Sequence, residues 1–196
     1  MLDQKTIDIY NSKADEYSRL VDFSPSGYLE DFINLFSKGS KILDLGCGTG
    51  VASEFMMKQG LVPDPVDGSE EMVKLSNQKP GLCARLCAFD ELDLDVKYSG
   101  VYAHFSLLHL KKHAFLECLS VIKEMVLQDG TLVLGMKAGT GERRDSLGRF
   151  YAYYTEPELQ SYFHSINFTV TNCYSGKSLG LSGDVEPWLV MFGRKL

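Results

Sequence analysis

The chain has 196 residues, of which 44% are hydrophobic and 23% are charged, and its formal net charge at pH 7 is -6. This length and composition are typical of one globular domain with a sizeable core, and they exclude two large domains. The acidic balance argues against a general nucleic-acid surface, which needs a basic field. We therefore expect a small-molecule partner.

Cysteine usage and the first residues suggest where the protein acts. The five cysteines are odd in number and form no CxxC pair, so we expect reduced, mostly buried thiols and no metal site. The first ten residues, MLDQKTIDIY, lack the apolar core of a signal peptide. No apolar run in the sequence approaches the length of a membrane span. These features predict a cytoplasmic protein with no membrane partner.

The first 38 residues are expected to form helices. Residues 6–20 carry apolar side chains at helical spacing, and residues 27–37 carry a second such stripe before the helix-ending Gly39. Tyr10 and Tyr17 share the first stripe and either close over a ligand or form a packing face. We interpret residues 1–38 as a helical lid on a core of residues 39–196, the two forming a single domain.

From residue 41 onward, apolar runs alternate with helical segments. We expect strands at residues 42–45, 62–66, 82–87, 101–105 and 131–136, with helices at 51–59, 70–77 and 112–127. This alternation predicts a doubly wound α/β sheet. A further helix at 156–164 precedes two strands, 167–173 and 188–192. Since no helix separates these two strands, they suit an antiparallel pair.

Two polar, glycine-rich segments interrupt this pattern and are expected to be loops. Residues 137–154 form the longer one, and loops of that size are usually functional or disordered. We expect this segment to lie on the substrate side of the domain. Residues 175–186 form the second, between the last two strands.

Residues 41–50, read as KILDLGCGTG, join a short apolar strand to a helix through three alternating glycines. In such a βα unit, backbone N–H groups at the helix start face the crevice at the end of the strand. A dinucleotide-binding turn needs G-x-G-x-x-G, but Val51 or Ser53 occupies the position of the last glycine. The turn therefore disfavours a dinucleotide-dependent oxidoreductase, which remains an alternative, and favours a cofactor without a pyrophosphate.

With these motifs, the chain resembles the class I S-adenosylmethionine-dependent methyltransferases over most of its length. Residues 44–50 (DLGCGTG) are similar to the first motif of that superfamily, and residues 67–69 (DGS) to its acidic second-strand end. Residues 89–90 (FD) match its adenine-side position, and residues 127–134 (LQDGTLVL) its fifth strand with the preceding turn. Residues 101–110 and 141–154 resemble a bacterial small-molecule subgroup that is called tellurite-resistance-like.

The resemblance implies a Rossmann-like, seven-stranded sheet of order 3-2-1-4-5-7-6, mostly parallel with an antiparallel last strand. It also implies S-adenosylmethionine as cofactor, S-adenosylhomocysteine as product and no metal. The cofactor-binding residues that we expect on this basis are Asp44, Gly46, Cys47, Gly48, Gly50, Asp67, Gly68, Met72, Phe89, Asp90, Phe105, Ser106 and Tyr17.

For the three aspartates among these residues we expect specific contacts with the cofactor. A carboxylate at Asp67, about twenty residues beyond the glycines, can accept from both ribose hydroxyls, although a solvated turn is the plain alternative. Asp44 is the only charge in an apolar strand and needs a partner, such as the methionine ammonium. Asp90 can accept from the adenine amine, or be one of several solvated charges.

The acceptor side is expected to involve His109, Arg149 and Tyr154. A histidine suits proton removal, but His109 can equally cap the next helix. Arginine forks bind carboxylates or oxyanions, so Arg149 allows an anionic small-molecule acceptor. The alternative for both loop residues is a solvated loop followed by packed aromatics. We expect in-line methyl transfer to O, N or S, the second hypothesis being a non-catalytic binder of the cofactor or its product.

Overall fold

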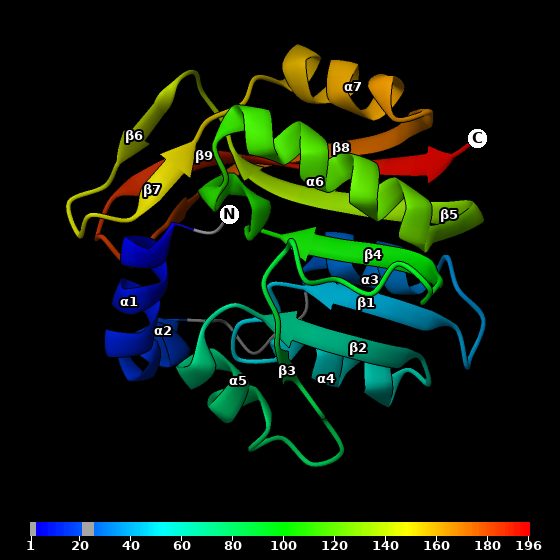
Figure 1. Cartoon of the computed structure of the whole chain (residues 1–196), viewed down its shortest axis with the longest axis horizontal. Coiled ribbons are helices and arrows are strands. Elements are labelled where there is room, and N and C mark those ends of the chain that lie inside the picture. Colours follow the sequence, from blue (N-terminus) through cyan, green and yellow to red (C-terminus); the bar gives the residue numbers. More distant parts are fainter. Residues whose placement is uncertain (1–2, 21–25) are drawn as a thin grey trace.

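The computed structural model describes residues 3–20 and 26–196, and it centres on one seven-stranded sheet (Figure 1). The strand order is β3-β2-β1-β4-β5-β9-β8, which, counted within this sheet, is the expected 3-2-1-4-5-7-6. The first five strands are parallel, and β9 is antiparallel to both of its neighbours. The predicted fold class is therefore confirmed.

The strands of this sheet are β1 (Lys41–Leu45), β2 (Val62–Asp67), β3 (Arg85–Leu86), β4 (Tyr98–His104), β5 (Val126–Lys137), β8 (Phe168–Leu179) and β9 (Val185–Lys195). Two helices that cover one face are α3 (Gly27–Ile33) and α4 (Val51–Lys58). Two that cover the other face are α6 (Lys112–Met125) and α7 (Glu156–Ser165). The sheet is thus buried on both sides, as a mostly parallel sheet must be.

Local sequence explains where these helices begin and what they bury. In α6, Phe115, Leu119 and Ile122 recur at helical spacing and are fully buried, which is the apolar stripe of an amphipathic helix. A capping box between Thr155 and Glu158 starts α7. The buried stripe of α6 and the capping box of α7 thus help to hold these two helices against their face of the sheet.

The N-terminal segment differs from the expected single helix over residues 6–20. It forms two helices, α1 (Gln4–Ser12) and α2 (Ala14–Leu20), separated at Lys13. The Ser12 hydroxyl donates to the Ile9 carbonyl, and such side-chain bonds compete with helix continuation. The expected lid of residues 1–38 also includes residues 1–2 and 21–25, which lie outside the described residues.

The third strand is shorter than the expected residues 82–87, since only Arg85 and Leu86 pair with β2. The Asp67 carbonyl faces β3 and accepts from Cys87. The backbone groups of alternate residues point to the same side of a strand, so those of Pro63 and Pro65 also face β3. As prolines, they offer no N–H to that strand. The backbone of Ala84 instead bonds the side chain of Asn77.

The two segments expected to be loops contain strands. Residues 137–154 include the hairpin of β6 (Glu142–Arg144) and β7 (Phe150–Ala152). Its turn is closed by the Asp145 carboxylate, which accepts from the amides of Leu147 and Arg149. Residues 175–186 are mostly strand, because β8 and β9 pair as far as Leu179 and Val185. Paired strands thus replace both loops.

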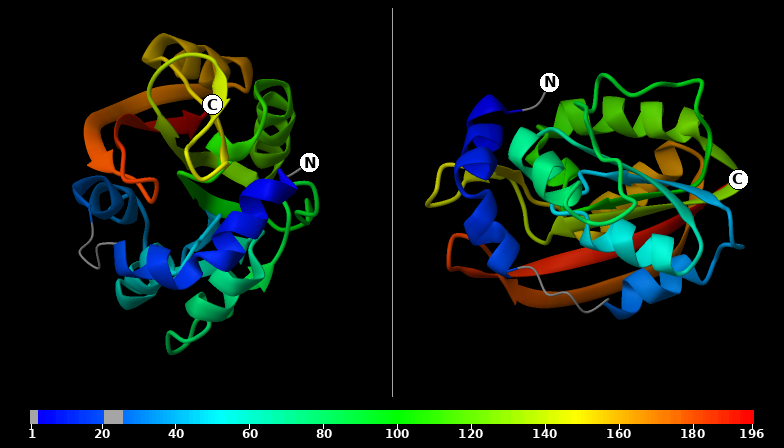
Figure 2. Two further views of the ribbon diagram at one scale, coloured as in Figure 1. Left: turned by 90° about the vertical axis from the view of Figure 1, so that its left-hand side faces the viewer. Right: turned by 90° about the horizontal axis from the view of Figure 1, so that it is seen from below.

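Several segments that are distant in sequence meet at the end of the sheet where the parallel strands finish. Helices α1 and α2 lie across this end, and the β6–β7 hairpin and the β8–β9 turn reach it from the other side (Figures 1 and 2). Among the described residues, no helix has the length and apolar character needed to cross a membrane.

Candidate active site

Two adjoining cavities lie at the ends of the parallel strands. The larger has a volume of about 510 Å³ and the smaller of about 70 Å³. The first value is within the range of about 300–1,000 Å³ that is usual for small-molecule sites. The residues that line both cavities are Tyr10, Tyr17, Gly46, Gly48, His104 and Phe105. These shared residues mark where the two spaces meet.

The glycine turn after β1 forms part of both cavities. Gly46 has a φ of 78°, and a Cβ added there would lie 2.2 Å from the Ser106 Cβ. Gly48 has a φ of 53°, but the nearest atom to an added Cβ would be a Tyr17 ring carbon at 3.9 Å. Packing therefore requires Gly46, whereas a side chain on Gly48 would enter the cavity. Gly50 precedes α4 and lines neither cavity.

Asp67 stands at the end of β2 and faces the smaller cavity. Its two carboxylate oxygens accept from the amides of Gly48 and Ser69, each at 2.8 Å. A carboxylate has about four acceptor positions, so others are left for a ligand. Gly68, Met72, Phe89 and Ser106 line the same cavity. An acceptor pair beside apolar walls suits a ribose with its base.

Asp44 is a buried carboxylate at the wall of the larger cavity. The Ser53 hydroxyl donates to it at 2.6 Å. Burial raises the pKa of Asp44 to about 7, although the Ser53 hydrogen bond opposes this change. No described lysine or arginine forms an ion pair with Asp44. The site therefore fits a cationic group such as an ammonium. Cys47, beside it, is also buried and lines this cavity.

His109 follows β4 and is held by hydrogen bonds from two directions. Its Nδ1 lies 2.7 Å from the Phe150 carbonyl oxygen, and its Nε2 lies 3.0 Å from the Tyr10 hydroxyl. Since a carbonyl only accepts, Nδ1 carries the proton and Nε2 accepts from Tyr10. Burial lowers the pKa of His109 to about 4. The ring is thus a neutral acceptor at the wall of the smaller cavity.

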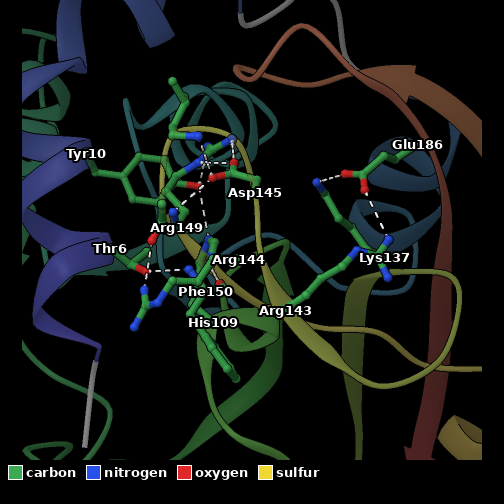
Figure 3. Close-up of polar contacts among 12 residues, drawn as sticks. Thr6, Tyr10, His109, Lys137, Arg143, Arg144, Asp145, Arg149, Phe150 and Glu186 are labelled. Carbon is green, nitrogen blue, oxygen red and sulfur yellow. Dashed lines mark hydrogen bonds and ion pairs between the residues drawn. The ribbon is translucent and has the colours of Figure 1, made fainter.

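Arg149 lines the larger cavity, but its guanidinium is already engaged. Its Nε and Nη2 donate to the Asp145 carboxylate at 2.9 and 2.7 Å, and its Nη1 donates to the Tyr10 hydroxyl at 3.1 Å (Figure 3). Both side chains of this ion pair are at most 5% exposed. The arginine therefore joins the β6–β7 hairpin to α1.

Besides Gly50, two of the predicted site residues are not brought to the cavities. The Tyr154 side chain is fully buried and packs against Phe115 and Tyr162. Asp90 is exposed in the turn after β3. Neither residue lines either cavity. Asp90 therefore gains no support from geometry for its adenine role, nor Tyr154 for a substrate role.

Helix α1 is fastened on both of its sides. Toward the hairpin, Asp3 pairs with Arg144 at 2.7 Å. The Thr6 hydroxyl oxygen accepts from the Phe150 amide at 2.9 Å (Figure 3). Toward α5 (Glu70–Ser76), Asn11 accepts a hydrogen bond of 2.7 Å from Ser69. The helix thus spans the smaller cavity, which Thr6 and Tyr10 line.

Sequence reasoning missed several residues of the larger cavity: Tyr28, His104, Lys137, Glu186 and Trp188. His104 ends β4, and its Nε2 lies 3.1 Å from the Tyr28 hydroxyl. The next residue, Phe105, has a φ of 56°, a strained value for a non-glycine residue that often marks a functional site. The position of His104 at a strand end was the available signal. The other residues come from segments that are distant in sequence from the glycine turn.

The geometry can be compared with known proteins. The family model described as "Tellurite resistance protein TehB" matches residues 25–178. The chain belongs to the TehB family. The class predicted from the sequence, the S-adenosylmethionine-dependent methyltransferases, is thereby confirmed, and the protein is an enzyme of that class. A protein of Staphylococcus carnosus named as an uncharacterized methyltransferase is 21% identical over 136 residues, which are 65% of this chain and 66% of that protein's length.

Solved structures agree with this fold. The structure of 1,6-didemethyltoxoflavin-N1-methyltransferase from Burkholderia thailandensis has a TM-score of 0.77 and 22% identity, covering 98% of this chain and 86% of that one. TehB from Haemophilus influenzae has a TM-score of 0.74 and 18% identity, covering 96% and 67%. No three His, Cys, Asp or Glu side chains of the described residues are grouped as a metal site requires.

Proposed function

We propose that this TehB-family enzyme transfers a methyl group in line to an O, N or S atom of a small-molecule acceptor in the larger cavity. The observation that carries the proposal is the junction of the two cavities at Gly46, Gly48 and Phe105. Bound S-adenosylmethionine supplies an electrophilic methyl group on a sulfonium, whose thioether leaving group needs no acid. The Burkholderia relative, solved with 1,6-didemethyltoxoflavin and S-adenosylhomocysteine, supports a small-molecule acceptor.

The cofactor-binding residues divide between the two ends of the molecule to be held. Asp67 accepts from the ribose hydroxyls, and Met72 and Phe89 contact the adenine in the smaller cavity. Asp44 binds the ammonium of the methionine portion, since it is a buried carboxylate without a cationic partner among the described residues. An adenine contact of Asp90 remains a prediction.

The remaining work of the protein is positioning and exclusion of water. The ring centroids of Tyr10 and Tyr17 lie 5.7 Å apart, edge to face, at the junction of the cavities. The two rings cover this junction from the side of the helical segment. Orientation of two reactants can supply about 7–11 kcal/mol of the barrier. The proposal includes the lid role of α1 and α2, and a substrate-side role of the β6–β7 hairpin.

A hydroxyl-like acceptor needs a base, and we assign that role to His109 acting through Tyr10. Tyr10 lines both cavities, and its hydroxyl already donates to the neutral Nε2 of His109. It can take the proton of the acceptor as it passes its own proton to His109. The hydrogen bond from Arg149 stabilises the negative charge that develops on the Tyr10 oxygen.

The anionic acceptor expected from Arg149 stays a prediction, and the pairing of that arginine with Asp145 weighs against it. The second hypothesis, a protein that binds the cofactor or its product without catalysis, differs in one respect only. It requires no acceptor to enter the larger cavity. A cytoplasmic location likewise remains a prediction.

The proposal is tested by calorimetric titration of S-adenosylhomocysteine into the protein and two variants. Asp67→Asn should weaken binding by about tenfold or more, because a hydrogen bond to a charged group contributes about 1.5–3 kcal/mol. Asp95→Asn, which removes an exposed carboxylate outside both cavities, is the matched control and should change affinity by about twofold at most. If the wild type does not bind, or if Asp67→Asn binds like the wild type, the cofactor assignment is wrong.

A further inference from the structure

We propose that the acceptor is a neutral, planar aromatic or heteroaromatic molecule. This inference rests on the proposed function, because it takes the larger cavity as the acceptor site. Two features of that cavity carry it, namely the pairing of its charged groups and the chemistry of its walls.

Apart from Asp44, which we assign to the cofactor ammonium, the charges of the larger cavity are compensated within the protein. Among the described residues, Asp44, Lys137, Arg149 and Glu186 are the charged groups that line it. Lys137 pairs with Glu186, and the Arg149 guanidinium makes a two-pronged ion pair with Asp145. An anion entering this space would lose its hydration without meeting a free cation, and uncompensated burial of charge is costly. A neutral acceptor avoids that cost.

Three contacting aromatic residues form one part of the cavity wall. Tyr28 comes from the helical segment, and Phe105 and Trp188 come from the strand ends. The Trp188 indole stands edge to face with Tyr28 at 5.8 Å and with Phe105 at 6.5 Å between ring centroids. Aromatic rings prefer such offset or edge contacts with other rings. A flat ring that enters this space therefore meets an aromatic surface against which it can pack.

The setting of Trp188 shows how the indole is kept in place. Trp188 pairs with Gly176 across the β8–β9 ladder. A Cβ on Gly176 would lie 2.4 Å from the indole Cζ2, so the glycine leaves room for the ring to lie over β8. The hydroxyl of Tyr28 and the imidazole of His104, 3.1 Å apart, supply neutral hydrogen-bonding groups nearby. Such groups suit a ring nitrogen or hydroxyl.

The test uses three bicyclic probes of similar size: 2-naphthol, 2-naphthoate and decahydro-2-naphthol. The second carries a negative charge on the same rings, and the third keeps the hydroxyl but has no aromatic ring. Each is titrated calorimetrically into protein saturated with S-adenosylhomocysteine. We expect 2-naphthol to bind about tenfold more tightly than either of the others.

Naphthoate binding as tightly as naphthol would overturn the neutral character of the acceptor. Equal binding of decahydro-2-naphthol would overturn its aromatic character, and binding of none of the three would overturn both. If S-adenosylhomocysteine itself does not bind, the proposed function fails first, so the two failures are distinguishable.

Variants test the two features separately. Asp145→Asn keeps the oxygen that closes the hairpin turn but releases the Arg149 charge, and should tighten naphthoate binding by about fivefold. Glu186→Gln releases Lys137 and repeats the test at a second position, should the first variant not fold. Trp188→Leu should weaken naphthol binding by about fivefold, whereas Trp188→Phe should retain most of it. Absence of any gain in naphthoate binding in either folded charge variant would contradict the role of charge pairing.

Discussion

Tyr10 and His109, which lie 99 positions apart in the chain, share a hydrogen bond of 3.0 Å. The same hydroxyl accepts a bond of 3.1 Å from Arg149. One phenol therefore joins helix α1, the segment after β4 and the β6–β7 hairpin. The contact that orients the neutral imidazole is also the one that seats the N-terminal helix.

Removing this hydroxyl should destabilise the protein. In Tyr10→Phe, the Nε2 of His109 and one nitrogen of Arg149 both lose a buried partner, and an unsatisfied buried polar group costs about 1–3 kcal/mol. We expect a lower midpoint of thermal unfolding. Tyr162→Phe, the same change at a half-buried tyrosine of α7 outside both cavities, is the control. Equal midpoints for the two variants would refute the linking role of Tyr10.

The glycine turn offers a pair of substitutions that separates stability from ligand binding. Gly46→Ala places a Cβ against Ser106 and should greatly reduce the free energy of unfolding. Gly48→Ala meets no such contact, so it should cost only about 1–2 kcal/mol for its positive φ. Its methyl group would nevertheless occupy the space of the cofactor. We expect a folded Gly48→Ala protein with at least about tenfold weaker S-adenosylhomocysteine binding. Retained affinity would contradict the proposal that the cofactor binds at the glycine turn.

Asp44 should make both stability and binding depend on pH. Its pKa in the folded protein, about 7, is above the ordinary aspartate value of 3.8, so the folded state holds a proton that the unfolded state releases. This group therefore lowers the free energy of unfolding progressively as the pH rises from about 4 to about 7. Comparison of pH–stability curves for the wild type and Asp44→Asn should show this slope in the wild type alone.

An ammonium group bound beside Asp44 would favour the ionised carboxylate. Binding of S-adenosylhomocysteine at pH 7 should then release about half a proton from this group. Calorimetry in two buffers with different ionisation enthalpies measures that release as a difference in apparent enthalpy. Identical enthalpies in the two buffers for the wild-type protein would show that Asp44 does not meet the ligand as proposed.

The parts of the fold that were predictable depend on neighbours in sequence. Strand β1, the turn at Gly46 and helix α4 follow one another directly, so apolar runs and glycine spacing suffice to find them. Ser69 likewise caps α5 by accepting from the amide of Met72, a near neighbour in the sequence. The order of the strands came from the family resemblance, which fixes connections that periodicity alone does not.

What could not be predicted depends on partners that are distant or unusual for their setting. Strand β6 carries the consecutive charged residues Arg143 and Arg144, whereas strands usually alternate polar and apolar residues. The β6–β7 hairpin was therefore expected to be a loop. Arg149 was expected to bind a ligand, because its i,i+4 pairing with Asp145 spans a turn and belongs to no helical pattern that would reveal it. Tyr154 was expected near the acceptor. The direction of its side chain depends on where the strand ends, which could not be predicted.

The two ligand sites draw on different parts of the sequence. With the exception of Tyr17, the proposed cofactor contacts, from Asp44 to Ser106, occupy one continuous middle portion, whereas Tyr28, Lys137 and Trp188 of the larger cavity lie outside it. The β8–β9 turn contributes its own residues, 178–181, to that outer wall. A chimera that exchanges residues 175–186 with those of a relative would therefore replace part of one site while leaving the glycine turn and Asp67 intact. Such a graft offers a route to altered acceptor selectivity on an unchanged cofactor platform.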